Sequence, residues 1–380
     1  MYHRFETPLR VGVLGGGQLG RMMLPAFQQY DLRVRVLDQD GAPMQAHAPG
    51  FRSGDITDYA TVLEFGRHCD LLTIEIEKIN LDALRQLQAD GKLIRPGLKV
   101  LEIAQDKGLQ KQFFYDQGYP SSPFALVDGA TKIGTDQLPA VQKLRKGGYD
   151  GHGVKMLKTL ADVDEAFTLP SLLEALVPVH KELSVVVARN SHGDVAVYPL
   201  VEMVFDPARN VLDYLLAPAQ VKPEIAREAE ALARQMATDL KLEGLMAIEL
   251  FLDKQEQLLV NEIAPRLHNS GHHTIEAATT SQFEQHLRAI LNLPLGATEL
   301  LSHAAMANIL GNPWKAGPPR YTGFPEALQL TDVHIHLYGK PESRPGRKMG
   351  HLTATGNSAE HVRQKVLQAR HRFKIEVDEA

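Results

Sequence analysis

Apolar and polar positions over residues 10 to 100 follow two alternating periods. Short apolar runs at 10–15 (RVGVLG), 33–38 (RVRVLD) and 69–77 (CDLLTIEIE) predict strands, and the stretch that starts at Gln18 has the spacing of a helix. Pro25 lies inside this helix, where proline interrupts the hydrogen bonding. Strands that alternate with helices are typical of α/β structure, so we expect a parallel sheet in this part of the chain.

Two changes of pattern divide the rest of the chain. A helical stretch over 106–117 is broken by GYPSSP at 118–123, which places a boundary near residue 103. Apolar residues at helical spacing predict an amphipathic helix packed in a core, namely Ile225, Ala229, Leu232, Met236 and Leu240. After Pro294 the pattern changes to short strands, AAMANILG and VHIHLYG. We expect three domains, over residues 1–103, 104–300 and 301–380, the last one small and rich in strands.

Two glutamates interrupt apolar runs near residue 250. The runs LMAIELFLD and LLVNEIA, with polar KQEQ between them, predict an antiparallel hairpin. If 254–257 form a four-residue loop, Asp253 faces Leu258 and Glu249 stands opposite Glu262. Directly opposed Cβ atoms lie about 5 Å apart, where like charges destabilise a sheet. A positive group is therefore expected between the two carboxylates. A divalent-cation site and an exposed edge that carries two glutamates are the two open hypotheses.

The composition is that of an ordinary soluble protein. The chain has 380 residues, 44% of them hydrophobic, and a net charge of -5, which gives no electrostatic footprint for nucleic acid or an anionic membrane. Cys69 is the single cysteine, which excludes an internal disulfide framework and suits a reducing cytoplasm. No signal peptide and no run of roughly 20 apolar residues is visible. We expect a cytoplasmic protein whose partners are small molecules.

A glycine-rich turn follows the first predicted strand. Residues 15–20, GGGQLG, fit the GxGxxG pattern, and Asp38 lies 18 residues beyond Gly20, at the end of the next strand. This spacing is typical of dinucleotide binding. A helix N-terminus also favours other anions, and small residues also allow a tight turn. A dinucleotide, another anionic ligand and a plain turn therefore stay open at this point.

Three further segments have the chemistry of anion binding. KGGYDGHG at 146–153, between two strand-like stretches, predicts a hairpin tip whose backbone N–H groups approach phosphate, with charge from Lys143; a flexible linker is the alternative. A polar cluster follows Glu262 and consists of Arg266, His268, Asn269 and Ser270. A basic cluster surrounds a glycine-proline turn and consists of Lys340, Arg344, Arg347 and Lys348. Either cluster could hold an anionic ligand or could simply be exposed to solvent. His272 and His273 could likewise be surface residues.

Several strings occur in one order along nearly the whole chain: GGGQLGRM, EIE at 75–77, KGGYDGHG, the pair AIEL and NEIAPRLHNSGHH, and YGKPESRPGRKMGH. Together they resemble the ATP-grasp superfamily and, within it, the N5-carboxyaminoimidazole ribonucleotide synthetase family of purine biosynthesis. GGYDG, NEIAPRxHNSGH and RPGRKxGH are specific strings, whereas GxGxxG is not. This resemblance favours the synthetase family over dinucleotide binding.

The resemblance implies an α/β (α+β overall) protein of the ATP-grasp fold, with a Rossmann-like pre-ATP-grasp domain, an ATP-grasp domain and a small C-terminal β-rich domain, assembled as a homodimer. It implies an ATP-dependent carbon-nitrogen ligase that uses ATP, Mg²⁺, bicarbonate and 5-aminoimidazole ribonucleotide and releases ADP and phosphate. In the family's mechanism bicarbonate attacks the γ-phosphate to give carboxyphosphate. The exocyclic amine of the ribonucleotide then captures the carboxyl group, or CO₂ released from it. No nucleic acid or membrane partner is expected.

The resemblance also implies roles for individual residues. The expected catalytic residues are Arg266, His268 and Asn269, and the expected metal ligands are Glu249 and Glu262. Expected ATP-binding residues are Lys107, Lys143, the lid residues Gly147, Gly148, Tyr149, Asp150, Gly151, His152 and Gly153, the hinge residues Glu174, Ala175, Leu176 and Val177, the ribose-binding Glu182, and Asn261 with Glu262. Expected ribonucleotide-binding residues are Gln18, Leu19, Tyr149, Asp150, Lys340, Arg347 and Lys348.

Some positions depart from the family pattern. Met203 and Phe205 stand where asparagine and histidine are expected, and His152 stands where the lid commonly has arginine or lysine. These departures leave the details of the nucleotide site there open. Two alternative functions also share parts of the pattern, a formate-dependent glycinamide ribonucleotide transformylase and a nucleotide sensor without turnover. GGYDG and the HNSGH loop argue against the first, and retention of both glutamates, Lys143 and Arg266 argues against the second.

Overall fold

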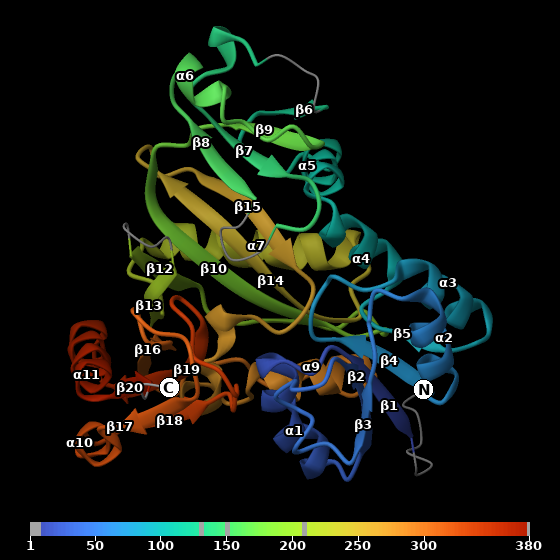
Figure 1. Cartoon of the computed structure of the whole chain (residues 1–380). Coiled ribbons are helices and arrows are strands. Elements are labelled where there is room, and N and C mark those ends of the chain that lie inside the picture. The colour runs from blue at the N-terminus through green and yellow to red at the C-terminus, as the bar shows by residue number, and fades with distance from the viewer. Residues whose placement is uncertain (1–8, 129–132, 149–152, 207–210, 378–380) are drawn as a thin grey trace.

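A five-stranded parallel sheet begins the chain, in the order β3-β2-β1-β4-β5 (Figure 1). Its strands are β1 (Arg10–Leu14), β2 (Arg33–Asp38), β3 (Gly50–Ser53), β4 (Leu71–Ile74) and β5 (Leu93–Ile94). Its helices are α1 (Gln18–Gln29), α2 (Tyr59–Arg67), α3 (Leu81–Ala89) and α4 (Leu98–Gln105). The computed structural model describes residues 9–128, 133–148, 153–206 and 211–377. The predicted parallel sheet is confirmed, and α1 continues through Pro25.

A small antiparallel sheet at the far end of the molecule follows, in the order β6-β9-β7-β8 (Figure 1). It contains β6 (Phe124–Val127), β7 (Ala140–Leu144), β8 (Val154–Leu157) and β9 (Ser171–Ala175), with α5 (Lys107–Asp116), α6 (Leu160–Val163) and the short 3₁₀ helix η1 (Thr135–Gln137) around it. The predicted hairpin on either side of the glycine-rich segment is confirmed, because β7 pairs with β8 from Ala140↔Leu157 to Lys143↔Val154.

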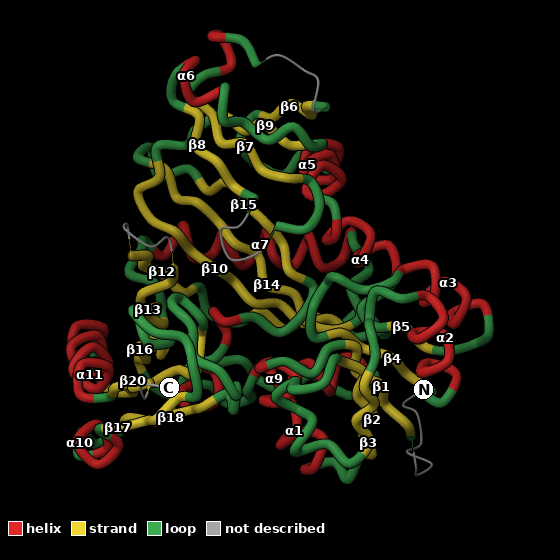
Figure 2. Tube along the Cα trace, in the orientation of Figure 1, coloured by secondary structure: helices red, strands yellow, loops and turns green. Residues whose placement is uncertain are grey.

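A nine-stranded sheet forms the centre of the molecule, in the order β15-β14-β10-β12-β13-β16-β19-β18, with β11 paired to β10 (Figure 2). Its strands are β10 (Val179–Arg189), β11 (Val195–Val197), β12 (Val201–Asp206), β13 (Val211–Ala217), β14 (Gly244–Asp253), β15 (Leu258–Ala264), β16 (His303–Leu310), β18 (Val333–Leu337) and β19 (Lys348–Gly356). Because β13 pairs with β16, the C-terminal strands extend this sheet.

Helix α7 (Pro223–Asp239) covers one face of the strands β10, β14 and β15. The residues predicted to form its apolar face are buried against that part of the sheet, which leaves the opposite face for the polar site. The remaining elements are η2 (Asn269–Gly271), α8 (Thr274–Ala277), α9 (Gln282–Ile290), β17 (Pro319–Thr322), α10 (Phe324–Leu328), α11 (Ala359–Arg372) and β20 (Lys374–Val377). Among the described helices none is both long and apolar enough to cross a membrane.

Buried histidines lie where the three parts of the chain meet. His286 on α9 contacts Thr73 Oγ1 on β4 at 2.9 Å, and His272 packs on His351 of β19 with ring centres 4.7 Å apart. The interpretation of His272 and His273 as surface residues is wrong, since they are 0% and 1% exposed. Burial lowers the pKa of His273 and His286 to about 4 and the pKa of His272 and His351 well below the ordinary value.

These histidines predict acid sensitivity of the fold. Their pKa is lower in the folded than in the unfolded chain, so below about pH 6.5 the unfolded chain binds more protons. The free energy of unfolding therefore decreases as the pH decreases. Each such group costs up to about 1.4 kcal/mol per pH unit in that window. We expect the melting temperature to fall by roughly 5 °C or more between pH 7 and pH 5. Calorimetry across this range tests the expectation, which a constant melting temperature contradicts.

Candidate active site

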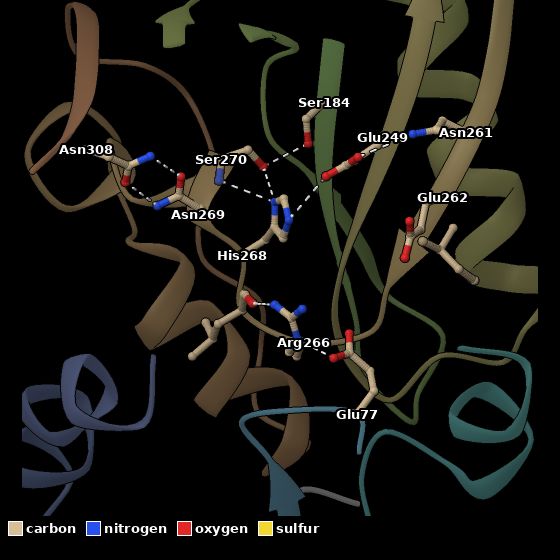
Figure 3. A network of polar contacts seen from close by, with 12 residues as sticks. Glu77, Ser184, Glu249, Asn261, Glu262, Arg266, His268, Asn269, Ser270 and Asn308 are labelled. Atoms are coloured by element: carbon tan, nitrogen blue, oxygen red, sulfur yellow. Dashed lines mark hydrogen bonds and ion pairs between the residues drawn. The ribbon is translucent and has the colours of Figure 1, made fainter. Parts of the chain in front are cut away.

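The two glutamates of the central hairpin stand side by side. Glu249 on β14 pairs with Glu262 on β15, as predicted, but the expected path between the loop and this pair is wrong. Leu252, not Asp253, faces Leu258, and a β-bulge between Glu249 and Leu250 takes up the extra residue. A bulge sets two residues of one strand against one of its partner. It explains why Asn261 and Glu262, although consecutive, both reach the polar face of the sheet (Figure 3).

A lysine supplies the positive charge that the opposed carboxylates require. Lys107 Nζ, at the start of α5, lies 2.5 Å from Glu262 Oε2. Desolvation acts to raise the pKa of Glu262, but Lys107, together with the charges of Lys143 and Arg266, outweighs it and holds that pKa below its usual range. Desolvation, and next the charge of Glu262, raise the pKa of Glu249 to about 7. The side chains of Glu249 and Glu262 remain 27% and 39% exposed, so both are accessible to a ligand.

The carboxylate pair fits Mg²⁺ held together with a phosphate. Magnesium prefers hard oxygen ligands and is commonly bound by one or two carboxylates plus substrate phosphates. Within the described parts of the chain, no group of three or more His, Cys, Asp or Glu side chains is arranged to hold a metal. Glu249 and Glu262 are two adjacent carboxylates, a number that fits Mg²⁺ when substrate phosphates supply further ligands.

A second charged cluster surrounds Glu174 at the end of β9. Lys143 Nζ lies 3.2 Å from Glu174 Oε2 and donates to Asn261 Oδ1 at 2.9 Å. Lys111 Nζ lies 3.6 Å from the same carboxylate oxygen and donates to Ser122 Oγ at 2.9 Å. Burial lowers the pKa of Lys111 to about 8, against the raising effect of Glu174. A small pocket between the two antiparallel sheets is lined by Lys107, Gln110, Lys111, Lys143, Leu172, Glu174, Asn261 and Glu262.

The expected hinge and ribose residues lie next to this pocket. Glu174 and Ala175 end β9, and Leu176 and Val177 continue toward β10, which begins at Val179. Glu182, two residues before Ser184 on β10, lies on the strand that pairs with β14. Desolvation raises the pKa of Glu182 to about 6, against the lowering effect of Lys143.

The glycine-rich lid is described only in part. Gly147 and Gly153 have positive φ angles of 80° and 79°, which side chains rarely adopt, so glycine suits both ends of the turn. Gly148 lies beside Gly153, whose added Cβ would lie 3.3 Å from the Gly148 Cα. The expected lid residues Tyr149, Asp150, Gly151 and His152 lie outside the described residues.

Arg266 joins the hairpin to the N-terminal domain. Its Nε lies 2.8 Å from Glu77 Oε2, and its Nη1 donates to the Leu267 carbonyl oxygen at 2.9 Å (Figure 3). Burial acts to lower the pKa of Arg266, but Glu77, Glu75 and Glu262 together raise it. The guanidinium is therefore a fixed positive charge beside the carboxylate pair.

His268 and Asn269 lie on the loop that follows. His268 Nε2 lies 3.4 Å from Glu249 Oε1, so the expected catalytic loop contacts the expected metal site (Figure 3). Asn269 and Asn308 exchange two amide hydrogen bonds, of 3.0 and 3.2 Å, which tie the loop to β16. Strand β14 of the central hairpin and strand β16 of the C-terminal segment thus both contact this loop.

The N-terminal glycine turn binds the protein's own carboxylates. Gly16 N donates to Asp38 Oδ2 at 2.6 Å, and Leu19 N donates to Glu75 Oε1 at 3.0 Å. A Cβ on Gly17 would lie 2.6 Å from Glu75 Oε1, so the close approach requires glycine. Asp38 and Glu75 thus occupy the donors that a dinucleotide phosphate would use in this turn.

The turn nevertheless meets the C-terminal basic cluster. Lys340 Nζ donates to Gln18 Oε1 at 2.7 Å and to the Lys348 carbonyl oxygen at 2.6 Å. Arg347 Nη1 donates to the Glu342 carbonyl oxygen at 2.8 Å. Residues of the first and last segments, 322 positions apart in the sequence, therefore lie in direct contact.

Several residues of the site carry no isolated sequence signal. Lys111 and Ser184 are buried polar residues within a helix and a strand, and Ser122 is a buried polar residue in the GYPSSP segment between α5 and β6. Gln282, 0% exposed, accepts from His268 N at 3.0 Å and donates to His268 O at 2.8 Å. Glu77 lies in the EIE string, which is part of the resemblance to the family. Nothing in that string indicates that Glu77 pairs with Arg266.

Family models match three segments of the chain. They are an ATP-grasp domain over residues 112–283, a ribonucleotide synthetase preATP-grasp domain over 9–105, and a phosphoribosylaminoimidazole carboxylase C-terminal domain over 304–365. The fold and these matches define an ATP-grasp enzyme with an N-terminal preATP-grasp domain, and the predicted fold class is confirmed.

Relatives agree over nearly the full length. The N5-carboxyaminoimidazole ribonucleotide synthase of Bacillus subtilis is 36% identical, with 90% of each chain covered. The crystal structure of N5-carboxyaminoimidazole ribonucleotide synthetase from Thermotoga maritima is 39% identical, has a TM-score of 0.90, and covers 97% of this chain and 100% of its own. An Aspergillus clavatus synthase in complex with ADP and 5-aminoimidazole ribonucleotide is 32% identical, with a TM-score of 0.86 and coverage of 96% and 99%. The chain belongs to the N5-carboxyaminoimidazole ribonucleotide synthetase family.

The predicted activity is thereby confirmed. The chain is an ATP-dependent ligase of purine biosynthesis that carboxylates 5-aminoimidazole ribonucleotide.

Proposed function

We propose that the cleft between the central hairpin and the loop 266–269 uses Mg²⁺-bound ATP and bicarbonate to carboxylate 5-aminoimidazole ribonucleotide. The observation that carries the proposal is the convergence of charged groups on this cleft. Glu249 and Glu262 lie near His268 and Arg266 in Figure 3, and on the other side Lys107 contacts Glu262 and Lys143 contacts Asn261. Opposite charges converge there on a space open to a ligand. The residue assignments, the three domains 1–103, 104–300 and 301–380, the cytoplasmic location and the homodimer are parts of the same proposal.

In this proposal the nucleotide lies between the small sheet and the central hairpin. Lys107, Lys143 and the lid glycines neutralise the phosphates, the segment 174–177 meets the adenine, and Glu182 accepts from the ribose hydroxyls. Glu249, Glu262 and Asn261 hold the metal and phosphate end. Bound Mg²⁺ would neutralise charge on the transferring phosphate. The contacts of Lys143 with Glu174 and Asn261 support this assignment, because Glu174 is proposed for the adenine end and Asn261 for the phosphate end of the same nucleotide.

The ribonucleotide lies across the edge shared by the first and last segments. Gln18, Leu19 and the lid residues 149–150 meet its ring, while Lys340, Arg347 and Lys348 take its 5′-phosphate. The hydrogen bond from Lys340 to Gln18 supports a site built from both segments. Arg266 provides fixed positive charge where bicarbonate becomes an acyl phosphate, and catalysis comes from positioning and charge neutralisation with water excluded.

Replacing Arg347 tests the phosphate assignment. We expect Arg347→Ala to raise the KM for 5-aminoimidazole ribonucleotide by roughly tenfold or more with little change in kcat, because a remote phosphate contact is nearly uniform through the reaction. Arg344→Ala is the matched control, since Arg344 lies on the same turn, is 62% exposed and pairs with Glu342. Steady-state kinetics with each substrate varied in turn measures the effect. A change confined to the KM for ATP means that the assignment is wrong.

A further inference from the structure

Ser184 is a polar residue in the apolar centre of β10. The run that follows it is Val185, Val186 and Val187, and Ser184 is 0% exposed. It stands directly opposite Glu249 in the strand pairing, so it belongs to the same row as the two carboxylates. A buried hydroxyl without a hydrogen bond is costly. Its partner in the structure is Ser270 Oγ, at 2.8 Å (Figure 3).

Ser270 links this hydroxyl to the imidazole of His268. Ser270 is also 0% exposed, and its Oγ lies 2.8 Å from His268 Nδ1. The backbone N of Ser270 donates to the same Nδ1 at 3.3 Å. A backbone amide can only donate, so in this arrangement Nδ1 accepts and the proton of the neutral ring lies on Nε2. The amide contact is long, so the shorter contact with the Ser270 hydroxyl, which then donates to Nδ1, contributes most of the stabilisation of this arrangement.

The direction of the whole chain of hydrogen bonds follows. Because Nδ1 accepts, the Ser270 hydroxyl donates to it, and Ser270 Oγ is left to accept from Ser184. The opposite end of the ring, Nε2–H, points to the cleft and lies 3.4 Å from Glu249 Oε1 (Figure 3). In this arrangement the neutral His268 offers the cleft a donor and has no lone pair there to take a proton.

We propose that Ser184 and Ser270 are positioning residues that hold His268 as its Nε2–H tautomer, so that His268 donates a hydrogen bond to a carboxylate-type oxygen in the cleft and does not act there as a base. The oxygen that accepts this hydrogen bond belongs to Glu249 in the free enzyme and, during turnover, to the bicarbonate-derived group. This second role rests on the proposed function. The tautomer itself depends only on the contacts of the loop and of β10.

Nitrogen NMR of the free enzyme tests the tautomer without any substrate. Long-range ¹H–¹⁵N spectra of histidine-labelled protein at slightly alkaline pH identify His268 by the signals missing from His268→Gln. We expect a protonated-type shift at Nε2 and an unprotonated-type shift at Nδ1. In Ser184→Ala the Nδ1 shift should move toward a mixture of tautomers, and Ser184→Thr, which keeps the hydroxyl, should restore it. Protonation at Nδ1 in the unmodified enzyme overturns the proposal.

Kinetics separates positioning from mere packing. Ser184→Ala loses one hydrogen bond of the relay, meaning the chain of hydrogen bonds from Ser184 through Ser270 to His268. This loss should lower kcat roughly five- to tenfold and leave the KM for MgATP close to that of the unmodified enzyme. Ser184→Thr should restore kcat. Val186→Ala is the matched control, because Val186 lies on the same face of β10, is 3% exposed and has no part in the relay. If Ser184→Ala only lowers the melting temperature, as Val186→Ala does, the proposal is wrong.

A second variant covers the case in which Ser184→Ala does not fold. Ser270→Ala removes the neighbouring hydroxyl of the same relay but leaves β10 intact, and it should lower kcat by at least as much. Unchanged kcat and an unchanged His268 spectrum in Ser270→Ala overturn the proposal. Failure of the proposed function would instead appear as absent turnover in the unmodified enzyme, with the NMR result unaffected.

Discussion

Glu262→Gln is expected to lose turnover of Mg-ATP by roughly a thousandfold while the fold stays intact. The substitution keeps the shape of the side chain but removes the charge that holds the proposed metal, an interaction worth several kcal/mol. It also removes the partner of Lys107, which lies 2.5 Å from the carboxylate. Relief of the repulsion with Glu249 and loss of the pair with Lys107 act in opposite directions on the stability of the folded state, so the melting temperature should change little. ADP release and thermal melting together measure the two effects.

The matched control lies on the same hairpin. Glu256 is an exposed carboxylate at the hairpin turn that pairs with Lys222, so Glu256→Gln should leave turnover unchanged. Titration with Mg²⁺ adds a second readout, because weaker metal binding raises the magnesium concentration needed for half-maximal rate. Unchanged turnover in Glu262→Gln would remove the basis for the metal assignment.

Arg266→Lys is expected to lower kcat by roughly a hundred- to a thousandfold, with a smaller change in the KM for ATP. Lysine keeps a positive charge but loses the planar group that contacts Glu77 and the Leu267 carbonyl oxygen. Removal of one preorganised group that stabilises developing charge typically has an effect of this size. Single-turnover measurements of ADP formation separate the chemical step from product release.

Arg10→Lys is the control for this substitution. Arg10 forms a two-point ion pair with Asp70, which directly precedes the neighbouring strand β4, so its loss should change stability slightly and kcat not at all. If Arg266→Lys retains kcat, Arg266 serves only to hold the hairpin against Glu77.

The apolar periods of the sequence were sufficient to predict most of the framework. The parallel sheet, the amphipathic helix α7 and the two hairpins follow from local alternation, which each segment carries by itself. The pairing of Glu249 with Glu262 was also predicted, although from a register at the turn that the structure does not have, because Leu252 rather than Asp253 faces Leu258. The register at the turn differs by one residue from the predicted one, and the extra residue at the bulge, Asn261, restores the predicted pairing of the two glutamates. Neither feature has a sequence signal strong enough to set the register by itself.

Long-range polar partners could not be predicted from local pattern. Ser184 lies 86 residues from Ser270, and Lys340 lies 322 residues from Gln18, so only the folded sheet order brings each pair together. Buried histidines were indistinguishable from surface residues, because polarity alone does not reveal that His272 packs under β19. The GxGxxG turn was ambiguous for a related reason. Its backbone N–H groups donate to Asp38, the last residue of β2, and to Glu75, which directly follows β4.

Release of ADP from Mg-ATP and bicarbonate, with and without 5-aminoimidazole ribonucleotide, tests the central claim most directly. Glycinamide ribonucleotide with formate serves as the parallel substrate pair, because a transformylase with the same architecture would use it. We predict release that depends on both 5-aminoimidazole ribonucleotide and bicarbonate. Release that depends on glycinamide ribonucleotide and formate, or no release with either pair, would contradict the account.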